Sequence, residues 1–126
     1  MPGKLTTHIL DTAHGCPASQ VKIDLYRLGD VTNPNDRTED RTFLKSILTN
    51  SDGRANEPLL EGDAFQAGGY ELIFHIGEYF QNKNNDRESI PFLNRIPIRF
   101  NVLDGNAHYH IPLLASPWSY STYRGS

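Results

Sequence analysis

The sequence contains a single cysteine, Cys16, among its 126 residues. One cysteine excludes an intrachain disulfide and gives no basis for a cysteine-rich zinc site. No stretch approaches the roughly 20 apolar residues that a membrane helix needs, and the first residues lack the apolar core of a signal peptide. From these absences we expect no membrane association. The most economical location is the cytoplasm, with a peroxisome or a periplasm left open.

An excess of charge of one sign is also missing. The chain has 12 basic and 15 acidic residues, a formal net charge of -3, and the two signs are interspersed. Binding to nucleic acid or to anionic lipid needs a concentrated basic face, so neither is an expected partner. The length corresponds to one domain, residues 1–126, with a single modest core.

What the sequence does contain is hydrophobic alternation with a period of two. In Val21–Leu25 and Ile96–Val102 every second residue is apolar, which is typical of a strand with one buried and one wet face. Further strands are expected at Leu5–Asp11, Arg41–Thr49, Tyr70–His75, His108–Leu114 and Ser119–Tyr123. Only Ile76–Asn82 is expected to be helical. Short strands at this spacing predict an all-β antiparallel sandwich or barrel.

Turn residues separate these strands. Asp104 and Gly105 lie between two alternating segments and predict a hairpin there. The polar stretch from Gly29 to Asp40 is expected to be a surface loop rather than a linker, because the flanking segments are too short to form separate domains.

The segment that begins at His108 separates two kinds of side chain. Tyr109, Ile111 and Leu113 alternate with His108 and His110, so the pleat predicts that both histidines face away from the apolar side. The simplest interpretation is a solvated face. A His-x-His pair on a strand is also found in zinc and copper sites, but no third ligand stands at a suitable spacing, so we expect no metal.

Other polar residues say less when each is taken alone. His8 shares a strand face with Thr6, and Arg54 follows a turn, where an arginine is usually a solvated charge. His14 and His75 are expected to be surface or turn residues. The C-terminal end is different, because Trp118–Tyr123 carries three aromatic residues where termini are usually frayed and polar. We therefore expect the end of the chain to be docked as a strand.

Four blocks together carry a resemblance to a known family. They have the sequences LTTHILDT, TNSDGR, HYHIPLL and YSTYRGS, and they span Leu5–Thr12, Thr49–Arg54, His108–Leu114 and Tyr120–Ser126. Their order and content resemble the 5-hydroxyisourate hydrolases of the transthyretin-like family over nearly the whole chain. The sequence departs from the family pattern at Trp118 and Ser119 and in the loop 29–40.

The resemblance implies a transthyretin-like (prealbumin-like) sandwich of two four-stranded, mostly antiparallel sheets with one short helix. It also implies that the first strand and the last two share a sheet whose outer face lines a channel between dimers of a homotetramer. The implied activity is hydrolysis of 5-hydroxyisourate to 2-oxo-4-hydroxy-4-carboxy-5-ureidoimidazoline in urate degradation, with no metal or cofactor. The partner would be this small-molecule substrate.

The resemblance assigns residues to this activity. The catalytic residues would be His8, Arg54, His110 and Ser126. The residues that bind substrate would be Tyr123, Arg124, Gly125 and His108. One of His8 and His110 would act as general base on water, while the other would orient the water or protonate the leaving nitrogen. Arg54 offers a planar fork of donors for the substrate's carbonyl oxygens.

Two other functions fit a fold of this class. A transthyretin-type carrier would bind a small aromatic ligand, but its pocket should be mainly apolar. A sandwich module for adhesion accounts for the fold and leaves the histidines and Arg54 without a role.

Overall fold

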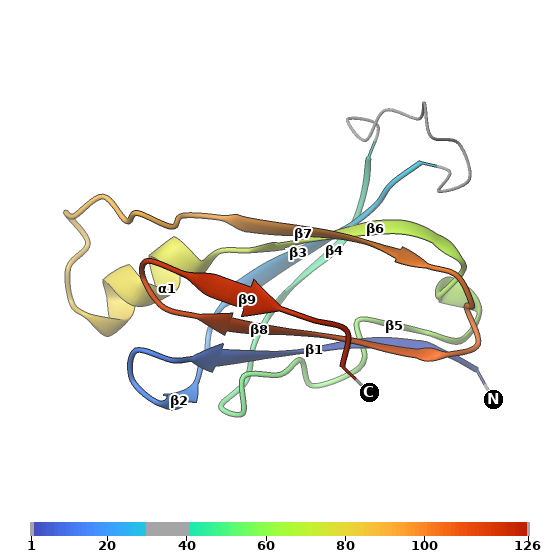
Figure 1. Cartoon of the computed structure of the whole chain (residues 1–126), viewed down its shortest axis with the longest axis horizontal. Helices are drawn as coiled ribbons and strands as arrows, with labels where there is room; N and C mark the ends of the chain where they lie inside the picture. The colour runs from blue at the N-terminus through green and yellow to red at the C-terminus, as the bar shows by residue number, and fades with distance from the viewer. Residues whose placement is uncertain (1, 30–40, 126) are drawn as a thin grey trace.

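The computed structural model describes residues 2–29 and 41–125. Two β-sheets pack face to face, and one helix lies at one end of the sandwich (Figure 1). No helix in the described ranges is long and apolar enough to cross a membrane. In chain order the elements are β1 Lys4–Asp11, β2 Cys16–Pro17, β3 Lys22–Arg27, β4 Thr42–Leu48, β5 Leu60–Glu61, a 3-10 turn Gly62–Ala64, β6 Gly68–Phe74, α1 Ile76–Lys83, β7 Ile96–Val102, β8 His108–Ala115 and β9 Tyr120–Thr122.

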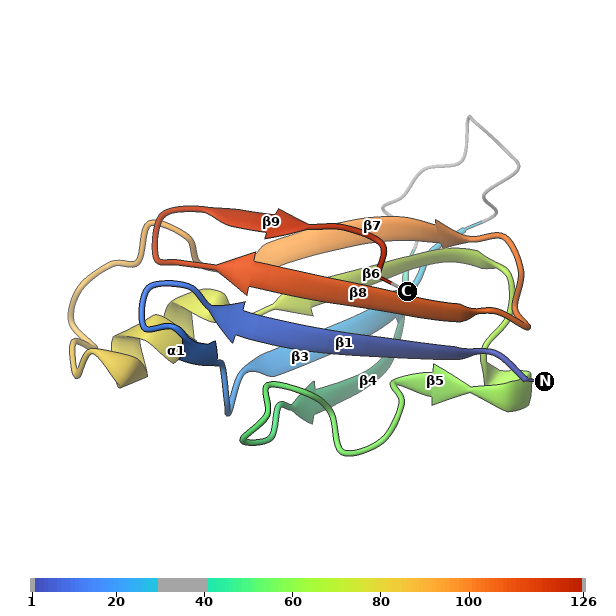
Figure 2. The ribbon, with the colours of Figure 1, turned by 60° about the horizontal axis from the view of Figure 1, so that its bottom comes forward.

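The first sheet brings the beginning and the end of the chain together. Its strand order is β2-β1-β8-β9, and β5 pairs with the start of β1. β1 and β8 run parallel, whereas the other pairs in this sheet are antiparallel. Figure 2 shows β1, β8 and β9 side by side, with the C-terminal end returning along β8. Residues more than a hundred positions apart therefore become neighbours.

The second sheet is antiparallel, with the order β4-β3-β6-β7. The core lies between the two sheets, because the inward residues of both are apolar and almost fully buried. Fully buried examples from the two sheets are Leu5, Ile9, Leu113, Tyr70, Leu72 and Phe74. Burial of such side chains is the main stabilising contribution to the fold.

The expected strands and the expected helix are present, with ends that differ by a few residues. The expected docking of the C-terminal segment is also confirmed, since β9 pairs with β8. The first sheet has five strands rather than four, because two-residue strands such as β2 and β5 are too short to show a period. Ser126 and residues 30–40 of the expected surface loop lie outside the described residues.

The hairpin predicted at Asp104 and Gly105 is wrong. The chain does turn there, with Asn106 N–H donating to Asp104 Oδ1 at 2.9 Å, but β7 pairs with β6 while β8 pairs with β1 and β9. The turn thus carries the chain from one sheet to the other. Tyr109 fixes it, because its hydroxyl accepts the backbone N–H of Leu103 at 3.0 Å. The turn residues thus predict that the chain changes direction, but they do not predict which strands pair with each other.

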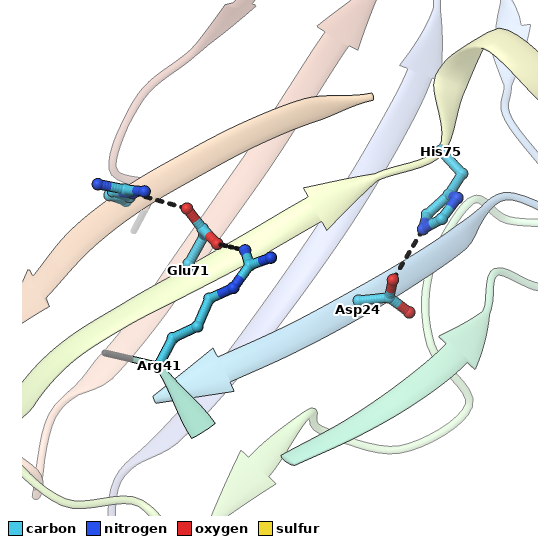
Figure 3. Close-up of polar contacts among 5 residues, drawn as sticks. Asp24, Arg41, Glu71 and His75 are labelled. Carbon is cyan, nitrogen blue, oxygen red and sulfur yellow. Dashed lines mark hydrogen bonds and ion pairs between the residues drawn. The ribbon is translucent and has the colours of Figure 1, made fainter. Parts of the chain in front are cut away.

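The expectation that His75 is a surface or turn residue is also wrong. Its side chain is only 4% exposed, at the junction between β6 and α1. Its Nε2 lies 2.8 Å from Asp24 Oδ2 on the neighbouring strand β3 (Figure 3). A buried imidazole needs such a polar partner, and the partner is 51 residues away in sequence, which no local pattern reveals.

Figure 3 also shows a buried carboxylate on β6. Glu71 is 1% exposed, and its carboxylate contacts the guanidinium groups of Arg41 and of Arg99, the latter at 2.6 Å from Nε. Burial acts to raise the pKa of Glu71, but the hydrogen bonds and charges of the two arginines outweigh it and hold the pKa below its ordinary value. The buried charge is therefore paired on both sides.

Replacing Glu71 with glutamine should lower the free energy of unfolding by about 2 kcal/mol, because two charge-assisted hydrogen bonds are weakened at a buried position. The arginines are about half exposed, so a larger loss is not expected. Urea denaturation at neutral pH measures the change. Since the pKa of Glu71 is lowered in the folded state, the difference should shrink below about pH 4.

The exposed Glu88→Gln variant removes the same charge without a buried partner and serves as the control. Equal stability of the two variants would contradict a role for Glu71 in holding the second sheet.

Candidate active site

The candidate site lies on the outer face of the first sheet. As the alternation predicts, Tyr109, Ile111 and Leu113 of β8 are buried in the core. The two histidines that alternate with them, at positions 108 and 110, face the other way. His108 is exposed and His110 is half-buried. The polar side chains here therefore lie on an outward-facing surface that takes no part in packing the core.

The parallel register joins this surface to β1. Thr6 stands opposite His110, and His8 stands two residues farther along, opposite Pro112. The Thr6 hydroxyl lies 2.7 Å from His108 Nε2 and 2.8 Å from His110 Nδ1. The sequence placed Thr6 on the same face as His8, but it gave no sign of this bridge, because the pairing of β1 with β8 is a long-range feature.

Arg54 reaches the site through a tight turn that is docked on β1. The Asn50 side-chain oxygen accepts the backbone N–H groups of Asp52 at 2.9 Å and Arg54 at 3.2 Å. Gly53 has φ of +75°, and its carbonyl accepts the Ile9 N–H at 2.9 Å. A Cβ at Gly53 would lie 2.4 Å from the Ile9 carbonyl oxygen, so only glycine allows this close approach.

The surroundings lower the pKa of both His8 and His110, so both imidazoles stay neutral at a lower pH than usual. Burial, followed by the charges of Arg54, His108 and His8, lowers the pKa of His110. Burial and the charge of Arg54 also lower the pKa of His8, although a hydrogen bond from its ring to the Asp52 backbone and the charge of Asp52 act in the opposite direction. The site therefore combines one permanent cation with two neutral imidazoles.

A hollow of about 220 Å³ opens beside these groups. It is lined by Lys4, Thr6, Thr7 and the segment 54–58, so it shares Thr6 and Arg54 with the site. A second hollow of about 410 Å³ is lined by segment 55–58 and by residues of β4; no histidine lines either hollow, and the second one shares neither Thr6 nor Arg54 with the site. The smaller hollow is the better candidate for a substrate, because it adjoins the groups that can transfer protons.

The HIUase/Transthyretin family profile matches residues 5–125 of the sequence. The chain belongs to this family. A relative from Rhizobium meliloti, 5-hydroxyisourate hydrolase 2, is 50% identical over 125 residues, which cover 98% of this chain and 97% of the relative. The site described above thus lies in a chain with a close hydrolase relative.

Solved structures agree with the family assignment. The crystal structure of an (S)-allantoin synthase superposes with a TM-score of 0.86 at 45% identity, covering 99% of this chain and 44% of that longer one. Sea bream transthyretin in complex with thyroxine superposes with a TM-score of 0.79 at 27% identity, covering 97% of this chain and 94% of the transthyretin. The fold is the transthyretin-like sandwich that the resemblance implied.

In this member of the HIUase/Transthyretin family, the C-terminal segment runs back along β8. The Gly125 N–H donates to the His110 carbonyl at 2.7 Å, and a Cβ at Gly125 would lie 2.5 Å from His110 Cδ2. The glycine thereby lets the backbone pack against the imidazole. Tyr123 is exposed, and the Arg124 guanidinium lies over the Tyr109 ring at 4.1 Å.

The structure therefore brings together His8, Arg54, His108, His110 and Gly125 of the predicted residues. Arg124 contacts an inward-facing tyrosine instead, and Ser126 lies outside the described residues. Among residues 2–29 and 41–125, no three histidine, cysteine or acidic side chains are grouped closely enough to hold a metal ion.

Proposed function

We propose that the chain hydrolyses 5-hydroxyisourate, the substrate for which its 50% identical relative is named. The observation that carries the proposal is that Arg54 lies close enough to His8 and His110, on the outer face of the first sheet, for its charge to lower the pKa of both imidazoles. Hydrolysis of a cyclic amide needs a deprotonated water, a stabilised oxyanion and a proton for the leaving nitrogen. The two imidazoles and the Arg54 guanidinium can meet all three of these requirements.

In this mechanism His8 is the general base. A neutral imidazole carries hydrogen on one ring nitrogen and a lone pair on the other, and the lowered pKa keeps His8 in this neutral form at neutral pH. That lone pair takes a proton from water, and the hydroxide attacks the amide carbonyl carbon. Because the pKa of His8 is lowered, the base is available without first losing a proton.

Arg54 binds the substrate's carbonyl oxygens and stabilises the negative charge that develops on the attacked oxygen. Its guanidinium cannot lose its proton near neutral pH, so it acts as a fixed charge and not as an acid. His110 then gives its Nε2 proton to the nitrogen as the carbon–nitrogen bond breaks, and its Nδ1 takes up a proton in the same step, so that the ring stays neutral. The products are a carboxylate and an N–H group on the released nitrogen, and no cofactor takes part.

The remaining assignments belong to the same proposal. The outer face of the first sheet would line a channel between two dimers of a homotetramer. Ser126 would complete the site, with its hydroxyl or terminal carboxylate binding substrate or a histidine. Tyr123 and Arg124 would hold the terminal segment in place, and His108 would support His110.

The decisive experiment generates 5-hydroxyisourate in situ by enzymatic oxidation of urate and follows its ultraviolet decay with and without the protein. We expect a large acceleration in proportion to protein concentration. A decay that the protein does not change, together with tight binding of an apolar aromatic ligand, would favour a carrier. The polar lining of the site argues against that alternative.

The dependence on pH should follow from the lowered pKa values. Neutral imidazoles are the reactive forms, and a lowered pKa keeps them neutral in more acidic solution, so kcat/KM should fall only below about pH 6.5. Initial rates, corrected for spontaneous decay, measure the profile. An acidic limb centred near or above pH 7 would contradict the proposed electrostatics.

A further inference from the structure

A threonine hydroxyl joins the two histidines of β8. Thr6 Oγ1 lies 2.7 Å from His108 Nε2 and 2.8 Å from His110 Nδ1, and both distances are those of good hydrogen bonds. The two imidazole centroids are 6.1 Å apart, so the rings do not bond each other directly. Among the described residues, the Thr6 hydroxyl is the group that hydrogen-bonds both rings.

Counting hydrogens restricts the states of this bridge. A hydroxyl has one hydrogen, and among the described residues the hydrogen-bond partners of the Thr6 hydroxyl are these two ring nitrogens. If the hydroxyl donates to His110 Nδ1, then His108 must donate from Nε2, and both rings carry hydrogen on Nε2. If it donates to His108 Nε2, both rings carry hydrogen on Nδ1. The two tautomers are therefore linked.

We propose that Thr6 is a positioning residue that couples His110 to His108, and that the three side chains relay protons between the reacting nitrogen and solvent. The catalytic part of this inference rests on the proposed function. In this relay the exposed His108 is the residue that exchanges protons with solvent. Thr6 itself touches no reacting atom.

The proton balance of one turnover is simple. His110 gives its Nε2 hydrogen to the leaving nitrogen while its Nδ1 takes the hydroxyl hydrogen of Thr6. The Thr6 oxygen takes the Nε2 hydrogen of His108, and His108 Nδ1 takes a proton from water. One proton has moved from solvent to the leaving group, and every ring is still neutral. The reverse transfer with solvent restores the starting tautomers.

The charges around the relay favour a neutral route over an imidazolium. The charges of Arg54 and His8 lower the pKa of His110, and Lys4 is paired with His108 in the register of β1 and β8. Glu57 lines the adjoining hollow together with Lys4, and Arg124 lies over the Tyr109 ring. A doubly protonated His110 would carry its charge next to Arg54, whereas the relay delivers a proton without forming that cation.

Thr6→Val tests the relay, because it keeps the side chain's shape and removes the hydroxyl. We expect kcat to fall roughly tenfold or more, with little change in KM, since the variant loses an interaction that acts in the chemical step. Thr6→Ser should restore most of the activity. Thr12→Val is the matched control, because the Thr12 hydroxyl bonds the Ala115 carbonyl at 3.1 Å outside the site, and its kcat should be unchanged.

A double-mutant cycle with His108→Phe separates a relay from two independent contributions. If Thr6 acts through His108, the double variant should be about as active as the worse single variant. Losses that simply multiply would overturn the coupling.

Nitrogen-15 NMR of histidine-labelled wild-type protein tests the same inference without substrate or mutation. In alkaline solution, where both rings are neutral, His108 and His110 should carry hydrogen on the same ring position, and Thr6→Val should release that link. Opposite tautomers in the wild type would overturn the relay. Failure of the wild-type protein to hydrolyse 5-hydroxyisourate would instead overturn the proposed function, and the NMR result would still decide the coupling.

Discussion

Replacing His110 with asparagine should lower kcat for 5-hydroxyisourate by about 10²–10⁴-fold, the range that a positioned acid or base contributes. Asparagine can still bond the Thr6 hydroxyl, but its amide cannot give a proton to the leaving nitrogen. The pKa of His110 is lowered by burial and by the charges of Arg54, His108 and His8, so this ring is placed and tuned for proton transfer at neutral pH. Stopped-flow decay of the substrate gives kcat and KM separately.

The matched control is His14→Asn, which removes an exposed imidazole that contacts Asp11 at 2.7 Å in the turn after β1. This variant should keep wild-type kcat. Circular dichroism and light scattering should show that both variants retain the fold and the assembly of the wild type. Wild-type turnover by the His110 variant would remove this residue from the mechanism.

Replacing Arg54 with methionine should lower kcat/KM by about 10²–10³-fold, comparable to the loss of one oxyanion-stabilising donor. Lysine at the same position should recover only part of the loss, because it restores the charge but not the planar fork. The turn at Asn50 and Gly53 positions the backbone and not the side chain, so neither variant should disturb the docking of the loop on β1.

Arg54→Met should also move the acidic limb of the pH profile upward. The charge of Arg54 lowers the pKa of both His8 and His110, so its removal lets these imidazoles protonate at higher pH. The exposed Arg95→Met variant removes a charge elsewhere and should leave the profile unchanged. A loss of rate with an unmoved limb would mean that Arg54 binds substrate without setting the electrostatics of the site.

The predictions from sequence succeeded where the signal is local. Alternation along β7 and β8 is a property of neighbouring residues, and it identified both the strands and the face on which His110 lies. The resemblance then grouped residues that no spacing connects, including His8 and Arg54. The parts of the site that depend on the register of β1 and β8 were not visible, and Thr6 is the clearest case.

The errors have the same cause. Asp104 and Gly105 predict a reversal of the chain, but the partner of each strand depends on packing across the whole sandwich. His75 resembles a polar residue at the end of a strand, and only its pairing with Asp24 explains its burial. Gly125 belongs to a recognisable terminal motif, yet the reason for glycine, contact with the His110 ring, needs coordinates.

The parallel pairing of β1 with β8 has a consequence for biosynthesis. Thr6 and His110 are 104 residues apart in sequence, so β1 has no central partner until β8 has been synthesised. Contacts this distant form late and slow folding. A nascent chain thus cannot assemble the site before β8 and the segment around Gly125 have left the ribosome tunnel.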